Sequence, residues 1–111
     1  MDLSQKKCVA CEGGIPPLAE ETIAKYMKMI DPEWKTDGKK IMRESKFKDF
    51  ADAIAFVNSV AKIAESAGHH PDIHIERWNH VRIELYTHAI GGLHENDFIV
   101  AAKIDKLLNK H

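Results

Sequence analysis

Histidine stands out among the residue types of this 111-residue chain that can do chemistry, because seven are present and four crowd between positions 69 and 80. An imidazole titrates near neutral pH, so it can donate or accept a proton, and a neutral ring can bind a metal such as zinc. His69 and His70 are adjacent, and His88 ends a later strand-like run. These three are therefore candidates for proton transfer or metal binding, against the alternative that they are solvated surface residues.

Cysteine is the second reactive residue type, and the only two, Cys8 and Cys11, form a Cys-x-x-Cys pair. Such a pair can be redox-active or can supply half of a zinc site, but a zinc site needs two further ligands. A thioredoxin-like pair follows a strand and opens a helix, whereas this pair lies in a lead-in rich in glycine and proline. We favour two thiols in a loosely ordered segment.

Composition excludes several classes of protein. The chain has 16 Lys and Arg against 17 Asp and Glu, with 44% hydrophobic residues, which is typical of one globular domain. This near-neutral balance argues against a direct nucleic-acid partner. No apolar run is long enough for a membrane span, and no secretory signal is visible, so we expect a cytoplasmic protein. Residues 1–15 read as a flexible lead-in and residues 16–111 as a single domain.

The first half of the chain predicts a helix followed by a hairpin. Apolar residues recur at helical spacing after Pro17, until Pro32 ends the helix. An Asp-Gly pair then separates two extended segments, 33–36 and 39–47, which is typical of a β-hairpin.

Residues 48–67 form the clearest predicted helix, and Gly68 is placed to end it in a left-handed conformation. Pro71 then favours an extended conformation at His70. The apolar stripe of this helix consists of Phe50, Ala53, Ile54, Val57, Val60, Ala61 and Ala64.

A second hairpin is predicted from two runs, 72–78 and 81–88, that alternate with period two around a turn. Antiparallel pairing places the end of the second run beside the start of the first, which brings His88 toward His69 and His70. The runs present an apolar face and a mixed face. The apolar face carries Ile73, Ile75, Val81, Ile83 and Leu85, and the other carries Arg82, Glu84 and Tyr86.

A final amphipathic helix over 95–109 completes the order α-β-β-α-β-β-α. This order predicts an α+β fold, in which three helices pack on one face of a four-stranded antiparallel sheet. The free sheet face or an exposed edge strand can contact a second copy of the chain.

Several of these residues share a spacing that resembles the signature of the pterin-4a-carbinolamine dehydratase family. The signature residues are Glu65, His69, His70, Pro71, Trp78, His88 and Asp97. The resemblance extends to Cys11-Glu-Gly-Gly, Pro16-Pro17-Leu18, Phe56, Ala64, Thr87-His88, Gly91-Gly92-Leu93 and the helix from Asp97 to Asp105, and it covers most of residues 8–107.

The resemblance implies an α+β hydro-lyase that needs neither cofactor nor metal, a 4a-hydroxytetrahydrobiopterin dehydratase. Such enzymes convert 4a-hydroxytetrahydropterin to quinonoid dihydropterin and so recycle the pterin of aromatic amino acid hydroxylases. The resemblance also implies a homodimer built through the sheets, often doubled to a tetramer. One alternative is a non-catalytic pterin-binding or dimerisation cofactor protein of the same fold, and another is a metal-dependent enzyme that uses the same histidines.

By resemblance, His69, His70 and His88 form the catalytic set. We expect His70 and His88 to move the protons and His69 to orient the pterin. Glu65 lies one helical turn before the pair, so its carboxylate either orients an imidazole or is simply exposed at the helix end.

The remaining signature residues have supporting roles. Pro71 directs the chain after the histidine pair, and Trp78 either flanks the pterin ring or is a core or interface aromatic. We expect Asp97 to cap the last helix and shape the site rather than to react. Two positions depart from the family pattern: Ala19 and His94 stand where serine or threonine often opens a helix, and we expect both to weaken helix starts.

Overall fold

The protein is described here by a computed structural model that places residues 2–9 and 13–109. The order of helices and strands confirms the predicted α-β-β-α-β-β-α arrangement, with two short 3-10 helices added. The elements are η1 (Leu3–Gln5), α1 (Glu20–Met27), β1 (Lys35–Thr36), β2 (Ile41–Lys46), α2 (Phe50–Ala67), β3 (Asp72–Glu76), β4 (His80–Leu85), η2 (His88–Ile90) and α3 (Glu95–Asn109).

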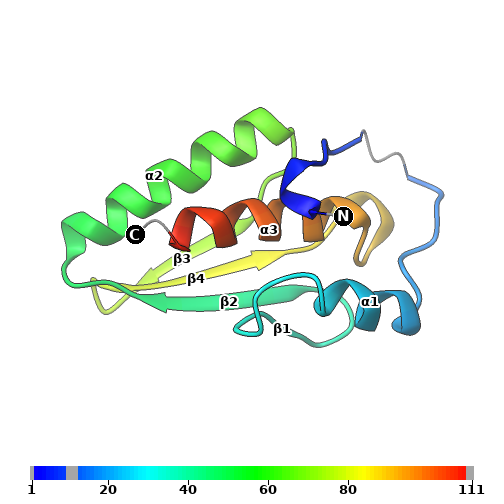
Figure 1. The fold of residues 1–111 in the computed structure, drawn as a ribbon, viewed down its shortest axis with the longest axis horizontal. Helices are drawn as coiled ribbons and strands as arrows, with labels where there is room; N and C mark the ends of the chain where they lie inside the picture. Colours follow the sequence, from blue (N-terminus) through cyan, green and yellow to red (C-terminus); the bar gives the residue numbers. More distant parts are fainter. Residues whose placement is uncertain (1, 10–12, 110–111) are drawn as a thin grey trace.

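The four strands form one antiparallel sheet in the order β1-β2-β4-β3. Both predicted hairpins are present, and β2 pairs with β4 to join them. The helices α2 and α3 lie across one face of the sheet (Figure 1). Helix α1 joins this layer through Tyr26, whose ring stacks on Phe98 of α3 with 5.1 Å between the centroids. The predicted α+β class is therefore confirmed.

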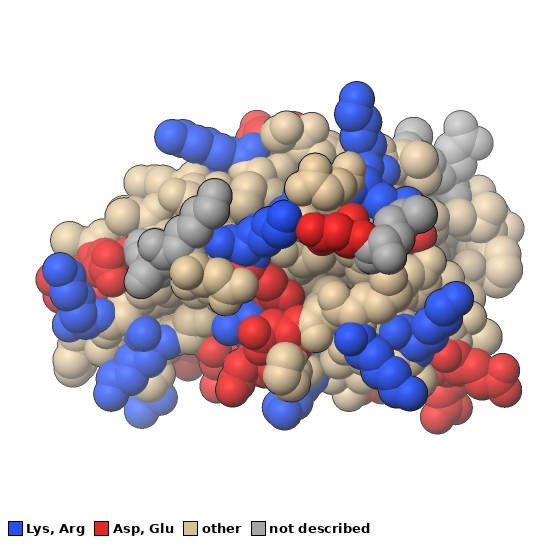
Figure 2. Space-filling view, viewed as in Figure 1, with Lys and Arg blue, Asp and Glu red and all other residues tan. Residues whose placement is uncertain are grey.

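The register of β3 and β4 gives the sheet its two predicted faces. Ile73 lies opposite Ile83 and Ile75 opposite Val81, so these residues share the face that α2 and α3 cover. On the open face, Glu84 accepts hydrogen bonds from Lys40 and Arg82, and these hydrogen bonds lower its pKa. Figure 2 shows acidic and basic side chains intermixed over the face in view, in keeping with the net charge of −1.

The buried face of helix α2 is rotated relative to the apolar stripe that its sequence predicts. Ala53, Val60 and Ala64 of that stripe are buried, together with Phe56, which the stripe did not include. Phe50 and Ala61 of the stripe are exposed. At 100° per residue, Phe50 projects to the flank of the helix and not toward the sheet. The inclusion of Phe50 in the core stripe was therefore wrong, because a broad apolar stripe does not reveal which of its edges meets the neighbouring layer.

Helix α3 is the centre of the core, and every residue from Asn96 to Ala102 is buried. Helix α3 is covered on both sides because the N-terminal segment packs on the side away from the sheet. In that segment Leu3 is buried, and the carbonyl of Ser4 accepts a hydrogen bond from Lys103 at 2.8 Å. Residues 2–9, expected to belong to a flexible lead-in, are thus in contact with the core in this structure.

A buried polar cluster ties α3 to the first hairpin. The carboxylate of Asp105 accepts hydrogen bonds from the indole of Trp34 and from Arg43, each at 2.7 Å, and from the backbone N–H of Asp31 at 2.9 Å. Burial raises the pKa of Asp105 despite these donors. Along the described chain, we find no helix with the length and apolar character required for a membrane span.

Candidate functional site

The histidine pair is positioned by the end of α2. Gly68 adopts the left-handed conformation (φ 66°), which L side chains rarely adopt, and ends the helix as predicted. The backbone N–H of His69 then returns to the carbonyl of Ala64 at 3.2 Å. This turn directs His69 toward α3, and Pro71 leads the chain on into β3.

His69 is held by a buried carboxylate. Its Nε2 lies 2.6 Å from Oδ1 of Asp97, whose side chain is fully buried, while the His69 side chain is 12% exposed. The other oxygen of Asp97 accepts hydrogen bonds from the Thr87 hydroxyl at 2.8 Å and from the backbone N–H of His94 at 3.0 Å. Because the carboxylate accepts, the proton of neutral His69 lies on Nε2, and Nδ1 is left as the acceptor of the ring.

His70 has the opposite environment. Its side chain is 61% exposed, and its Nε2 contacts the exposed carboxylate of Glu65 from the last turn of α2. Glu65 therefore contacts an imidazole and is also exposed at the helix end, so an orienting role for its carboxylate stays a prediction. An exposed contact of this kind restrains the His70 ring only weakly.

His88 does not end a strand as predicted: β4 ends at Leu85, and His88 begins η2 in the connection to α3. Thr87 and Gly92 form an isolated antiparallel bridge that closes this connection, and η2 lies within it. The exposed ring of His88 packs on Tyr86, with the centroids 4.2 Å apart and the rings inclined by 51°. Since Thr87 binds Asp97, the carboxylate that holds His69 also fixes the residue before His88.

The segments that carry the three histidines are linked through Asp97 and through the chain itself. Across residues 2–9 and 13–109, no hydrogen bond or ring contact joins their imidazoles directly. Asp97 contacts both His69 and the segment that carries His88, and His70 follows His69 directly in the chain. The arrangement offers one fixed imidazole and two exposed ones, which suits a small ligand that is held by one group and exchanges protons with others.

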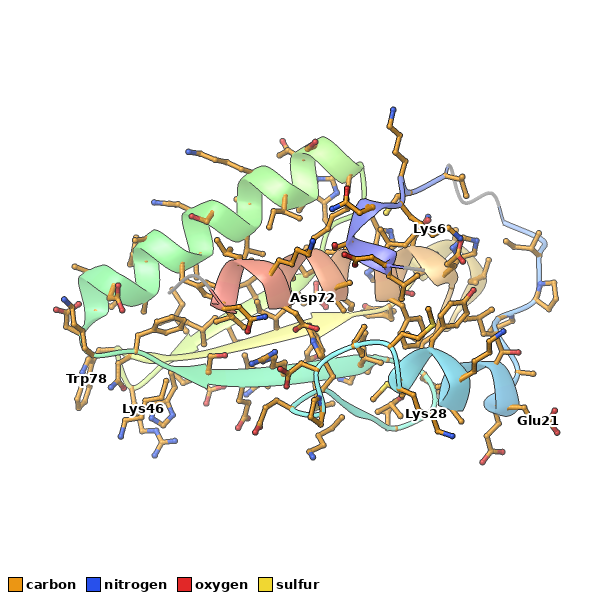
Figure 3. All side chains as sticks on the ribbon, in the orientation of Figure 1. Lys6, Glu21, Lys28, Lys46, Asp72 and Trp78 are labelled. Atoms are coloured by element: carbon orange, nitrogen blue, oxygen red, sulfur yellow. The ribbon has the colours of Figure 1, made fainter. Side chains whose placement is uncertain are left out.

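Trp78 does not lie with the three candidate histidines of its own chain. It occupies the β3–β4 turn with φ 54° and is 63% exposed. The paired strands place this turn beyond Glu76 and His80, at the opposite end of the hairpin from Asp72. Figure 3 shows Trp78 at one end of the molecule, away from Asp72 and Lys6. The expectation that Trp78 is a core aromatic is therefore wrong for its own chain. Contact with the pterin ring and contact with a second copy of the chain both stay predictions.

At the start of α3, the expectation that His94 weakens the helix cap is wrong. Its Nδ1 accepts a hydrogen bond from the backbone N–H of Asn96 at 3.0 Å, so the imidazole replaces the hydroxyl as helix cap. Asp97 also accepts the N–H of His94, as expected of a capping carboxylate. At α1, by contrast, Ala19 makes no side-chain cap hydrogen bond, which agrees with the weak start that was predicted.

The cysteine pair is only partly described, because Cys11 lies outside the described residues. Cys8 is half-buried against the core, and burial raises the pKa of its thiol, the opposite of what a reactive thiolate requires. Within residues 2–9 and 13–109, no group of three or more His, Cys, Asp or Glu side chains is arranged to hold a metal ion.

Two residues of the site were not singled out from the sequence as site residues. Thr87 binds the buried carboxylate, and Tyr86 packs on His88. The alternation of the second hairpin placed Tyr86 on the open face, but it gave no reason to expect a ring contact after β4 ends at Leu85. Thr87 directly precedes His88 in the family-like motif, and this position next to a candidate histidine is the sequence feature that could have identified Thr87 as a site residue.

Comparison with known proteins supports the resemblance across the domain. The model of the family described as pterin 4 alpha carbinolamine dehydratase matches residues 16–107. A protein of Nitrosospira multiformis, provisionally named a pterin-4-alpha-carbinolamine dehydratase, is 50% identical over 106 residues, which cover 96% of this chain and 92% of the relative. A protein of Nitrosomonas eutropha with the same provisional name is 46% identical over 107 residues, covering 96% and 94%.

Solved structures agree with this assignment. A transcriptional coactivator/pterin dehydratase from Brucella melitensis is similar to this chain with a TM-score of 0.74 and 33% identity, over 82% of this chain and 97% of that one. A pterin dehydratase-like protein identified as a RuBisCO assembly factor in the alpha-carboxysome has a TM-score of 0.54 and 25% identity, over 67% and 84%. With the family model matching most of its length, the chain belongs to the pterin 4 alpha carbinolamine dehydratase family.

Proposed function

We propose that this chain dehydrates 4a-hydroxytetrahydropterin to quinonoid dihydropterin by histidine acid–base catalysis, and so recycles the pterin of aromatic amino acid hydroxylases. The reaction breaks the C4a–O bond as the hydroxyl receives a proton, and a base removes the proton from N5. Water leaves and a C4a=N5 double bond forms, so no oxidant or reductant is required. Both proton transfers suit imidazoles, which exist in both protonation states near neutral pH.

The observation that carries this proposal is the pairing of His69 with the buried carboxylate of Asp97. A solvated surface histidine needs no such support, whereas a ring that must present one nitrogen to a ligand needs its tautomer and orientation fixed. Within the proposal, His69 orients the pterin, and the exposed rings of His70 and His88 exchange the two protons.

The alternative is a non-catalytic pterin-binding or dimerisation cofactor protein of the same fold. The name of the RuBisCO assembly factor indicates that pterin dehydratase-like proteins take other roles. The complete set of His69, His70 and His88, with Asp97 in place, favours the enzyme for this chain. The proposal also includes a homodimer or homotetramer, since β3 is an edge strand that pairs with β4 alone among the described strands.

A stopped-flow assay of chemically generated 4a-carbinolamine tests the proposal. We expect the wild-type protein to accelerate dehydration, and His70→Ala and His88→Ala each to lose about 10²-fold or more of that rate, the usual contribution of a positioned acid or base. His74→Ala is the matched control, because it removes a partly exposed imidazole from the open sheet face.

Three outcomes contradict the proposal. A wild-type protein without acceleration favours the binding alternative, and unchanged rates in both His70→Ala and His88→Ala remove the catalytic assignment. Stoichiometric zinc in the purified active protein, with loss of rate on chelation, replaces proton transfer by metal chemistry.

A further inference from the structure

A groove with a volume of about 810 Å³ lies between the N-terminal segment, α2 and α3, and none of the three candidate histidines lines it. Lysines dominate its wall, and they come from three separate parts of the chain. They are Lys6 and Lys7 before the first helix, Lys62 on α2, and Lys103 and Lys106 on α3. In Figure 2, basic side chains stand out along the upper side of the molecule, where Figure 1 places α2 and the N-terminal segment.

The positive charge of this groove is only partly balanced. Lys6 pairs with Glu95 at 2.8 Å and Lys106 pairs with Asp2 at 3.1 Å, but neither carboxylate is among the residues that line the groove. Lys103 donates to the neutral carbonyl of Ser4.

Lys7 and Lys62 are the other two lysines that line the groove. Within the described parts of the chain, the ammonium groups of Lys7 and Lys62 make no ion pair. Lys7, Lys62 and Lys103 thus line one groove that has no carboxylate among its described lining residues, in a protein whose net charge is −1. Like charges gathered in this way repel one another, and an anion placed between them relieves that repulsion.

We propose that this groove binds a small organic di- or triphosphate. A lysine ammonium acts as a point charge that suits a phosphate oxygen from many directions, and three of them require a ligand with more than one negative charge. The hydroxyl of Ser66 and the side chain of Gln5 lie in the same wall and can donate to further phosphate oxygens.

The size and chemistry of the wall favour a small molecule over a nucleic acid. A volume of about 810 Å³ is within the range of small-molecule pockets. Single-stranded nucleic acids require aromatic side chains on which bases stack, and no aromatic residue is among the described residues that line this groove. Ile63 and Ala67 instead provide a short apolar wall beside the lysines, against which the organic part of a phosphate ester can pack.

Isothermal titration calorimetry on the full chain tests the proposal, with inorganic triphosphate, adenosine triphosphate and orthophosphate as probes at low ionic strength. We expect both triphosphates to bind with one site per chain and much more tightly than orthophosphate. The double variant Lys7→Gln/Lys62→Gln should weaken triphosphate binding by about tenfold for each lysine removed, since each charge-assisted hydrogen bond contributes that order of affinity. Tighter binding of adenosine triphosphate than of inorganic triphosphate identifies a nucleotide-like ester as the ligand class, and equal binding identifies the phosphate chain alone.

The matched control is Lys25→Gln/Lys39→Gln, which changes the net charge equally but removes exposed lysines outside the groove. This variant should bind triphosphate as the wild type does. The proposal is overturned if the wild-type protein does not bind triphosphate, if orthophosphate binds equally well, or if both double variants lose the same affinity, since that result reports diffuse charge and not a site. Because dehydration is measured separately, failure of this proposal leaves the proposed enzyme activity unaffected, and the reverse also holds.

Discussion

Replacing Asp97 by asparagine is the most direct test of how the site is built. The two residues have the same shape, but only one oxygen remains. Oδ2 of Asp97 accepts from both Thr87 and the N–H of His94, whereas Oδ1 accepts from His69 alone. The asparagine oxygen therefore retains more hydrogen bonds at the Oδ2 position, which turns its NH₂ group toward His69. His69 can satisfy this donor only by moving its own proton from Nε2 to Nδ1.

The expected magnitudes follow from this exchange. One charge-assisted hydrogen bond is replaced by a neutral one, so the free energy of unfolding should fall by about 1–2 kcal/mol. In the proposed mechanism Nδ1 of His69 faces the pterin as an acceptor, and in the variant it becomes a donor. A lost or mismatched hydrogen bond in a buried site costs about 1.5–3 kcal/mol, which corresponds to a loss of about 10- to 100-fold in kcat/KM.

Three measurements on one preparation test this reasoning. Urea denaturation gives the free energy of unfolding, stopped-flow dehydration gives kcat/KM, and ¹⁵N NMR of the imidazoles reports which ring nitrogen of His69 carries the proton. Asp105→Asn is the matched control, because it removes another buried carboxylate of α3 that binds Trp34 and Arg43 instead of a histidine. It should lower stability and leave both kcat/KM and the His69 tautomer unchanged.

The reasoning is refuted if Asp97→Asn keeps the wild-type kcat/KM with an altered tautomer, because orientation of His69 is then irrelevant to the reaction. It is also refuted if Asp97→Asn and Asp105→Asn lose activity equally while both remain folded. In that case Asp97 acts only through the stability of α3.

Two further predictions concern the segments that support the site. A Cβ at Gly92 would lie 2.8 Å from Cβ of Pro17, so Gly92→Ala should lower the free energy of unfolding, measured by urea denaturation, by about 1–3 kcal/mol. Gly13→Ala is the control and should destabilise the protein much less, because its new Cβ would have its nearest contact at 3.4 Å. Equal losses of stability in the two variants would contradict this packing argument. Hydrogen bonds from Lys6 and Tyr26 lower the pKa of Glu95 from its ordinary 4.5, so its stabilising contribution is complete above that pH and is lost as pH falls through the lower folded-state value. Glu95→Gln should therefore destabilise the protein more at about pH 6 than at about pH 3, and a destabilisation independent of pH would show that the charge of Glu95 does not matter.

The elements that carry the histidines were predictable because their signals are local. The alternation of the second hairpin assigned Ile73 and Ile83 to one face, and the register of β3 and β4 bears this out. Gly68 ends α2 in the left-handed conformation that its position suggested. Side-chain direction repeats with the period of a helix or strand, so spacing along the chain is enough to read it.

The exposure of Phe50 and the cap at His94 were not predictable in the same way. A helix with apolar residues around more than half of its circumference has several faces that can meet a sheet, and the neighbouring layers select one. His94 caps α3 because its imidazole is held where Nδ1 reaches the N–H of Asn96, and the usual preference for small polar residues does not anticipate that geometry.

The sequence by itself determined the order of the elements, the class of fold, the candidate histidines and the family. Only the tertiary structure decided that Asp97, 28 residues away, holds His69, and that the N-terminal segment meets α2 and α3 to gather five lysines around one groove. These contacts join residues that are distant along the chain. Their formation depends on how whole layers dock, and that docking leaves no periodic signal in the local sequence.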